Sequence, residues 1–139
     1  MIVSEIIDVL KDAKVKKKKA FICGNGGSYC NALHFAEDLE SKGIRAVALG
    51  DVGFLTATAN DISYDKVFSR PLFVFADYGD ILFTLSTSGA SKNILDVQYT
   101  ARQLGVHVFP FPMNIETGKT TPRTEEVHLA LIHDIIEKL

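Results

Sequence analysis

The stretch "ICGNGGSYCNALHFAEDL", residues 22–39, decides the fold. It starts as a short apolar run, turns through Gly24, Gly26 and Gly27, and continues as an amphipathic segment. Glycines let a backbone approach an anion closely, and the N-terminus of the next helix offers unpaired N–H groups. The stretch therefore predicts a strand, a ligand-binding loop and a helix, the junction at which parallel sheets bind ligands.

The predicted helix carries a histidine and an acid four residues apart, His34 and Asp38. Residues at this spacing lie about 40° apart around a helix axis, so both side chains can face one cleft. An imidazole and a carboxylate can transfer protons or bind zinc. The spacing is also that of an ordinary exposed i,i+4 pair, and on its own it leaves both interpretations open.

The composition bounds the class of protein. The chain has 139 residues, 47% of them hydrophobic, and a net charge of −2, which predicts a single globular domain over residues 1–139. This charge gives no electrostatic reason to expect nucleic acid or a membrane surface as partner. No apolar run approaches the ~20 residues that span a bilayer. Glu5 and Asp8 interrupt the N-terminal apolar pattern, unlike a signal peptide. We therefore expect a cytoplasmic protein.

Apolar strands alternate with helices outward from the glycine stretch. The patterns predict strands at 20–23, 44–49, 80–86 and 106–111. They predict helices near the N-terminus, over 28–42, over about 91–104 and from about 123 onward. Residues 54–76 are expected to be helical in pieces, with Pro71 as the interruption. This alternation predicts an α/β fold with a parallel sheet covered on both faces.

A second loop of small polar residues, "STSGAS" at 86–91, follows the third predicted strand. Its hydroxyls and the following helix N-terminus could bind phosphate oxygens. Either loop alone is explained as well by a tight turn with capping serines. Two such loops at neighbouring strand ends predict a phosphate site. Neither G-x-G-x-x-G nor a Gly-Lys-Ser/Thr loop is present.

Five collinear segments resemble one known family. They are "GNGGSYCNALHFAEDL", "TATAND", "VFSR", "LSTSGASKNIL" and "EEVHLALIH". Together they are similar to the sugar isomerase (SIS) domain family and, within it, to the phosphoheptose isomerases of heptose biosynthesis. The resemblance implies a flavodoxin-like, three-layer α/β/α fold. It also implies interconversion of sedoheptulose 7-phosphate and D-glycero-D-manno-heptose 7-phosphate through an enediol, by a homotetramer with active sites between subunits.

The resemblance also implies roles for individual residues. Those expected to bind the phosphosugar are Asn25, Gly26, Ser28, Asp61, Ser86, Thr87, Ser88, Ser91 and Glu125. Asp38 and His133 are the implied proton-transfer pair. Some members of the family bind zinc at the positions that match His34, Asp38, Glu125 and His133, so the implied cofactor is zinc. Glu125 and His133 lie roughly 80° apart around the last predicted helix, within one broad face.

The chain departs from the family at several positions. Asp38 stands where the family has glutamate, Glu125 where it has glutamine, and Pro122 where it has aspartate. A strand and a helix are missing or collapsed between "VHVFPF" and "TTPRTEEVH". Besides an active isomerase, these departures leave two alternatives. One is a non-catalytic SIS module that binds a sugar phosphate or a protein partner, and the other is a shortened structural remnant.

Three further expectations concern packing. Cys23 is expected in the core, and His107 and His128 are interpreted mainly as packing residues. The first and last helices carry more apolar positions than one covered sheet face needs, so we expect them near subunit interfaces. Those positions are Ile2, Ile6, Val9, Leu10, Leu129, Leu131, Ile132, Ile135 and Ile136.

Overall fold

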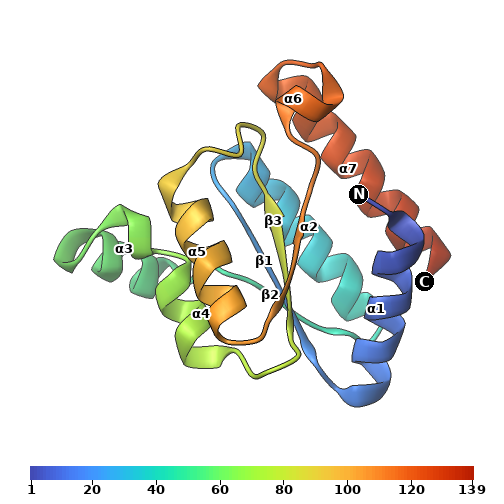
Figure 1. Ribbon diagram of the computed structural model, residues 1–139, viewed down its shortest axis with the longest axis horizontal. Helices are drawn as coiled ribbons and strands as arrows, with labels where there is room; N and C mark the ends of the chain where they lie inside the picture. The colour runs from blue at the N-terminus through green and yellow to red at the C-terminus, as the bar shows by residue number, and fades with distance from the viewer.

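The computed structural model describes residues 1–139 and has the predicted alternation of helices and strands (Figure 1). The elements are α1 (Val3–Lys16), β1 (Lys19–Gly24), α2 (Gly27–Ser41), β2 (Arg45–Ala48), α3 (Val52–Asp61), the 3₁₀ turn η1 (Tyr64–Lys66), α4 (Ser69–Phe75), β3 (Ile81–Leu85), α5 (Lys92–Gln103), β4 (His107–Pro110), α6 (Asn114–Thr117) and α7 (Thr121–Lys138).

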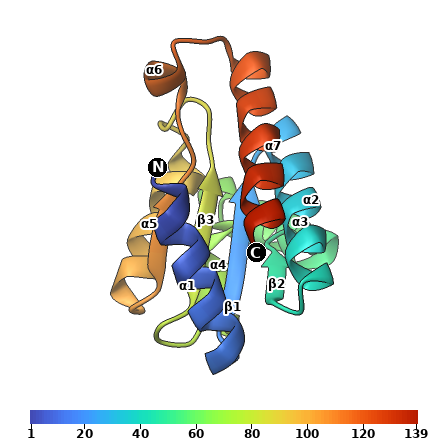
Figure 2. The ribbon, with the colours of Figure 1, turned by 90° about the vertical axis from the view of Figure 1, so that its right-hand side faces the viewer.

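The four strands form one parallel sheet in the order β2-β1-β3-β4. The chain therefore reverses direction across the sheet between β1 and β3, the position at which open α/β sheets bind ligands. The register pairs Gly24 with Leu85, which places the loops after β1 and β3 side by side. Helices α1, α2 and α7 cover one face, and α4 and α5 cover the other (Figures 1 and 2). The predicted three-layer α/β/α fold is confirmed.

β1 is buried on both faces, which explains why its sequence is continuously apolar instead of alternating. Ala20 and Ile22 pack in the core under α1, α2 and α7, whereas Phe21 and Cys23 pack in the core under α4 and α5. Burial raises the pKa of the Cys23 thiol far above its ordinary value. Cys23 is thus a core residue, as predicted, and it stays a neutral thiol.

The segment between β2 and β3 differs from the prediction. Pro71 does not interrupt a helix, because it lies in the first turn of α4, where its missing N–H has no intrahelical partner to lose. The breaks fall earlier, at the end of α3 and around η1, where Ser63 accepts a hydrogen bond from the Asp65 N–H. None of the helices is long and apolar enough to cross a membrane.

The connection between β4 and the last helix is short. One turn of helix, α6, connects β4 directly to α7, with no fifth strand. The sequence pattern placed the start of the last helix near residue 123, but α7 begins at Thr121 and takes Pro122 into its first turn. This agrees with the predicted loss of a strand and a helix.

The apolar residues of α1 and α7 pack mainly against the core of their own chain. Ile6, Leu10, Ile132 and Ile135 are buried in the core that the two helices share with the sheet. Ile2 is exposed, and Val9, Leu129, Leu131 and Ile136 are only partly buried. The expectation that the two helices lie near subunit interfaces therefore stays a prediction. A further group of exposed large apolar side chains lies on α3 and α4, at Val52, Phe73, Val74 and Phe75.

Candidate active site

The loops after β1 and β3 enclose a small polar cavity at the carboxyl edge of the sheet. Its volume is about 90 Å³, and it is lined by Asn25, Ser28, Leu85, Ser86, Thr87, Ser88, Ser91, Thr121 and Glu125. Because water occupies roughly 30 Å³ in the liquid, the cavity suits a group the size of phosphate and not a whole sugar. Hydroxyl groups dominate its lining, and no lysine or arginine belongs to it.

The serine loop is folded by its own hydroxyls. The Gly89 N–H donates to Ser86 Oγ at 3.0 Å, and the Ala90 N–H donates to Ser88 Oγ at 3.2 Å. Ser91 occupies the N-cap position of α5 but makes no side-chain capping bond. Its hydroxyl and the first N–H groups of α5 are therefore available to an anion.

The glycine loop brings an acid close to this cavity. Gly26 has a φ of +58°, which favours glycine. A Cβ atom at Gly27 would come within 2.5 Å of Glu125 Oε2, so this glycine allows the α7 carboxylate to approach the start of α2. Asn31 Nδ2 donates to the Glu125 carbonyl oxygen at 3.0 Å and holds the two helices together. A carboxylate thus lies beside the cavity, where the family has a neutral glutamine.

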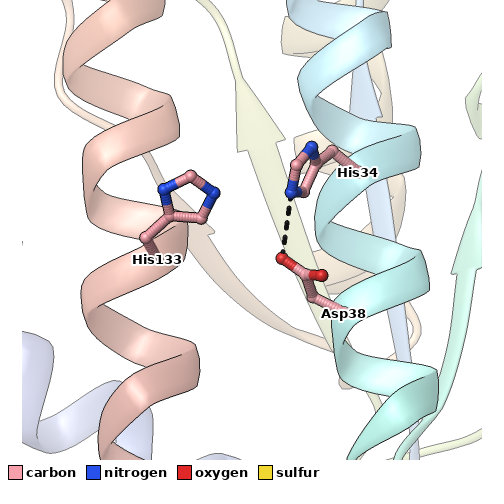
Figure 3. A group of neighbouring side chains, drawn as sticks. All are labelled: His34, Asp38 and His133. Carbon is pink, nitrogen blue, oxygen red and sulfur yellow. Dashed lines mark ion pairs between the residues drawn. The ribbon is translucent and has the colours of Figure 1, made fainter.

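His34, Asp38 and His133 meet further along the same two helices (Figure 3). His34 Nε2 lies 3.1 Å from Asp38 Oδ2, and the His34 and His133 ring centroids are 5.3 Å apart. One ligand atom from each residue lies within 4.8 Å of the other two. Two imidazoles and one carboxylate are a zinc donor set that leaves a fourth position open, as in catalytic zinc sites.

Three of the four residues that the resemblance grouped as metal ligands lie together. Glu125 lines the polar cavity and does not belong to the group formed by His34, Asp38 and His133. The reason is the rise along α7, since eight residues advance the helix by about 12 Å.

Two predicted sugar contacts lie outside the cavity lining. Asp61 is exposed at the end of α3, where it accepts a hydrogen bond from Asn60 Nδ2 at 2.8 Å. Gly26 shapes the loop without lining the cavity. The other seven predicted contacts, Asn25, Ser28, Ser86, Thr87, Ser88, Ser91 and Glu125, all line it.

Thr121 lines the cavity and was not predicted. Its hydroxyl accepts a hydrogen bond from Asn114 Nδ2 at 3.1 Å and lies 3.4 Å from the Thr87 hydroxyl. The available signal was a hydroxyl residue at a helix start. It was missed because the helix was expected to begin two residues later.

The segment after β4 is fixed against the serine loop. The Asn114 N–H donates to the Thr87 carbonyl at 2.7 Å, and His128 Nε2 lies 2.6 Å from the Pro112 carbonyl. His128 is fully buried, its ring packs edge-on against Phe111, and burial lowers its pKa. The packing interpretation is confirmed for His128. It is wrong for His107, which is exposed on the edge strand β4.

Comparisons with known proteins agree with this architecture. The profile of the SIS domain family matches residues 3–111. The chain is 37% identical to a phosphoheptose isomerase of Hamiltonella defensa, over 92% of this chain and 72% of that protein. It is 36% identical to a phosphoheptose isomerase of Haemophilus ducreyi, over 83% of this chain and 70% of the relative.

Solved structures show the same similarity. A phosphoheptose isomerase from Neisseria gonorrhoeae superposes with a TM-score of 0.89 at 29% identity, over 97% of this chain and 83% of that one. The Vibrio vulnificus NanR protein complexed with ManNAc-6P superposes with a TM-score of 0.65 at 18% identity, over 99% of this chain and 52% of that one. This second likeness concerns the fold alone.

Proposed function

The chain belongs to the SIS domain family and is similar within it to phosphoheptose isomerases, and from this premise we propose that it isomerises sedoheptulose 7-phosphate to the corresponding aldose. The observation that carries the proposal is the placement of two sites on one pair of helices. A hydroxyl-lined cavity lies at the start of α2 and α7, and a histidine–carboxylate cluster lies further along them.

The phosphate is assigned to the polar cavity. Ser91 and the N-terminus of α5 would donate to its oxygens, together with hydroxyls of the serine loop. A crystal soaked in inorganic phosphate should show the anion there, in contact with Ser88 and Ser91. Density at a different site, with this cavity empty at saturating phosphate, would contradict the assignment.

The spacing of the two sites suits a seven-carbon sugar. Ser28 lines the cavity and His34 follows six residues later, a rise of about 9 Å along α2. Six carbon–carbon bonds of an extended chain span about 7 Å, judged from the reach of an extended backbone. A heptose held by its 7-phosphate would therefore bring C1 and C2 to the turn of α2 that carries His34.

Asp38 and His133 are the proposed proton-transfer pair. Asp38 takes the proton from C1, and His133 delivers a proton to the C2 oxygen, which produces the enediol. Return of a proton to C2 and removal of one from the C1 hydroxyl gives the aldose, with no net change in atoms. His34 positions Asp38 through the 3.1 Å contact between their side chains.

Zinc is the proposed cofactor of the same cluster. When zinc is bound, its ligands would be His34, Asp38 and His133, because their donor atoms fit zinc and Glu125 lies with the phosphate cavity. The proton transfer by Asp38 and His133 described above belongs to the metal-free cluster. Bound zinc would polarise the substrate carbonyl. Metal analysis of the purified protein should find zinc, and a His34→Ala variant should lose it.

We propose in addition that the chain acts as a single SIS domain in a cytoplasmic homo-oligomer, on the pattern of a tetramer. The exposed apolar side chains of α3 and α4 support assembly, and they adjoin a cavity of about 680 Å³ lined mostly by apolar residues. Light scattering at micromolar concentration should give a mass well above 15.3 kDa. A stable monomer would contradict this part of the proposal.

The deciding experiment is incubation with sedoheptulose 7-phosphate, followed by NMR detection of the aldose product. Asp38→Glu distinguishes the isomerase from a non-catalytic binding module, the alternative that the short connection between β4 and α7 supports. An isomerase should keep or raise its activity when the longer side chain is restored. Binding of the substrate without turnover in both proteins would identify a binding module instead.

A further inference from the structure

Three elements meet at the side chain of Asn25, which follows β1 and lines the polar cavity. Asn25 Nδ2 donates to Asn93 Oδ1 at 2.9 Å, and Asn93 Nδ2 donates back to Asn25 Oδ1 at 2.9 Å. The Tyr64 hydroxyl also donates to Asn25 Oδ1, at 3.1 Å. Asn93 belongs to the first turn of α5 and Tyr64 to η1. We call these three residues the amide clasp.

Within the amide clasp, most donor and acceptor positions of the Asn25 side chain are already hydrogen-bonded. A carboxamide has two acceptor lone pairs on oxygen and two N–H donors. Both lone pairs of Asn25 Oδ1 are occupied, one by Asn93 and one by Tyr64. One of the two Nδ2 protons is used by Asn93. A single N–H donor remains for a ligand in the cavity.

The partners of Asn25 are themselves fixed. Asn93 is only 2% exposed, so its amide is held for Asn25 and not for solvent. η1 is joined to α5 by the ion pair between Lys66 Nζ and Asp96 Oδ1 at 2.7 Å. Rotation of the Asn25 amide by 180° would place its oxygen against Asn93 Oδ1 and its nitrogen against Asn93 Nδ2. The clasp therefore fixes the position of the Asn25 amide and couples its orientation to that of Asn93.

We propose that Asn93 and Tyr64 are positioning residues that hold the Asn25 amide in place, with a single hydrogen-bonding position left for the bound phosphosugar. Neither residue was among the predicted site residues. The identity of the ligand rests on the proposed function, whereas the clasp itself does not. The consequence is specificity, because a ligand group must meet the one hydrogen-bonding position of Asn25 that the clasp leaves free.

The first test observes the clasp without any ligand. The side-chain NH₂ signals of Asn25 are assigned in ¹⁵N-labelled protein by their disappearance in Asn25→Asp. They should shift in Tyr64→Phe and in Asn93→Leu. They should stay in place in Tyr78→Phe, because Tyr78 is an exposed tyrosine that follows α4 and has no hydroxyl hydrogen bond. Unshifted Asn25 signals in Tyr64→Phe, a change at the surface that the fold should tolerate, would overturn the proposal.

The second test asks whether Tyr64 acts through Asn25. Tyr64→Phe should raise the KM for sedoheptulose 7-phosphate by about fivefold, the effect of one hydrogen bond, and leave kcat nearly unchanged. In an Asn25→Ala background the same change should have no further effect. Independent, additive effects would overturn the positioning role. Absence of wild-type turnover and binding would refute the proposed function instead, while the NMR test would still decide the clasp.

Discussion

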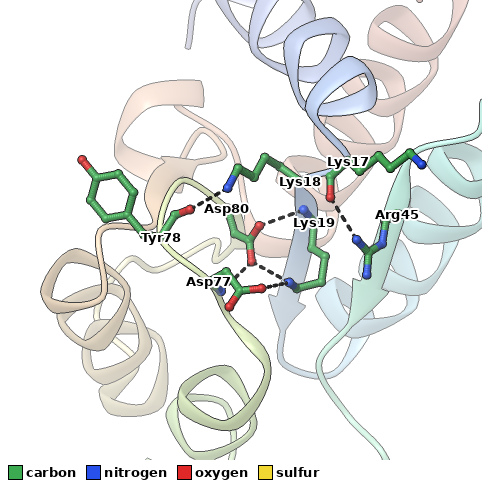
Figure 4. A network of polar contacts seen from close by, with 7 residues as sticks. All are labelled: Lys17, Lys18, Lys19, Arg45, Asp77, Tyr78 and Asp80. Atoms are coloured by element: carbon green, nitrogen blue, oxygen red, sulfur yellow. Dashed lines mark hydrogen bonds and ion pairs between the residues drawn. The ribbon is translucent and has the colours of Figure 1, made fainter.

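At the amino-terminal edge of the sheet, polar groups are paired with one another (Figure 4), whereas at the carboxyl-terminal edge hydroxyls and N–H groups face a cavity. Asp80 is fully buried beside the start of β3. Its carboxylate accepts hydrogen bonds from the Lys19 N–H at 2.9 Å and the Asp77 N–H at 2.7 Å. Lys19 Nζ completes the pairing at 3.1 Å from Asp80 and 2.7 Å from Asp77.

The electrostatics of the amino-terminal edge reinforce this pairing. Burial alone would lower the pKa of Lys19, but its hydrogen bonds to Asp77 and Asp80 raise it above the ordinary value. The hydrogen bond from Lys19 in turn lowers the pKa of Asp77. The two edges of the sheet therefore have different roles. The edge with satisfied groups contributes stability, and the edge with available donors contributes binding.

The largest expected effect falls on turnover, at the cluster of His34, Asp38 and His133 that lies further along α2 and α7 than the cavity. Asp38→Asn and His133→Ala should each lower kcat by about 10²–10⁴, because each removes a positioned proton donor or acceptor. Since His133 is exposed and Asp38 only partly buried, urea denaturation should give nearly unchanged stability. Steady-state kinetics measures turnover, and a binding titration measures substrate affinity separately. Full activity in both variants would exclude Asp38 and His133 from the mechanism.

The next effect should appear at the amino-terminal edge and in stability alone. Asp80→Ala leaves two backbone N–H groups and a lysine without their buried partner, so it should cost about 3 kcal/mol of unfolding free energy. Asp77→Ala, at an exposed carboxylate, is the matched control and should cost much less. Urea denaturation measures both. A loss of kcat in the still-folded Asp80→Ala protein would contradict the claim that the amino-terminal edge contributes stability alone.

A smaller effect is expected on the affinity of the cavity for phosphate. Glu125→Gln removes a negative charge from the lining, so inorganic phosphate should bind about thirtyfold more tightly, because two unit charges about 8 Å apart repel by about 2 kcal/mol at an effective dielectric near 20. Calorimetric titration gives the dissociation constant, with Glu126→Gln as the control on an exposed neighbour. Equal affinity in wild type and Glu125→Gln would show that the carboxylate does not face the anion.

The smallest effect concerns the response to acid. Burial lowers the pKa of His128 in the folded chain, whereas in the unfolded chain it titrates near its ordinary value of 6.5. As the pH falls through that value, His128 becomes protonated in the unfolded chain but stays neutral in the folded chain. Acid therefore favours the unfolded chain, and the unfolding free energy decreases. His128→Gln should weaken this decrease between pH 7 and pH 5. Parallel stability curves for the two proteins would contradict it.

The parts of the fold that depend on local pattern were predictable. A buried strand such as β1 needs a continuous apolar run, and a glycine such as Gly26 marks a backbone turn with positive φ. The chemistry of both loops was therefore visible in the sequence, including the hydroxyls of Ser86 and Ser91. Helix boundaries were less predictable, because Pro71 and Pro122 are accommodated in first turns.

The sequence by itself determined the α/β class, the two polar loops and the residue types of the site, because periodicity and turn chemistry act over a few residues. Tertiary structure decided which of these residues meet. It placed Glu125 at the cavity and His133 with His34, because helix rise separates residues that share a face. It also joined Asn25 to Asn93 across 68 positions of sequence, a contact that depends on the order of strands and leaves no local pattern.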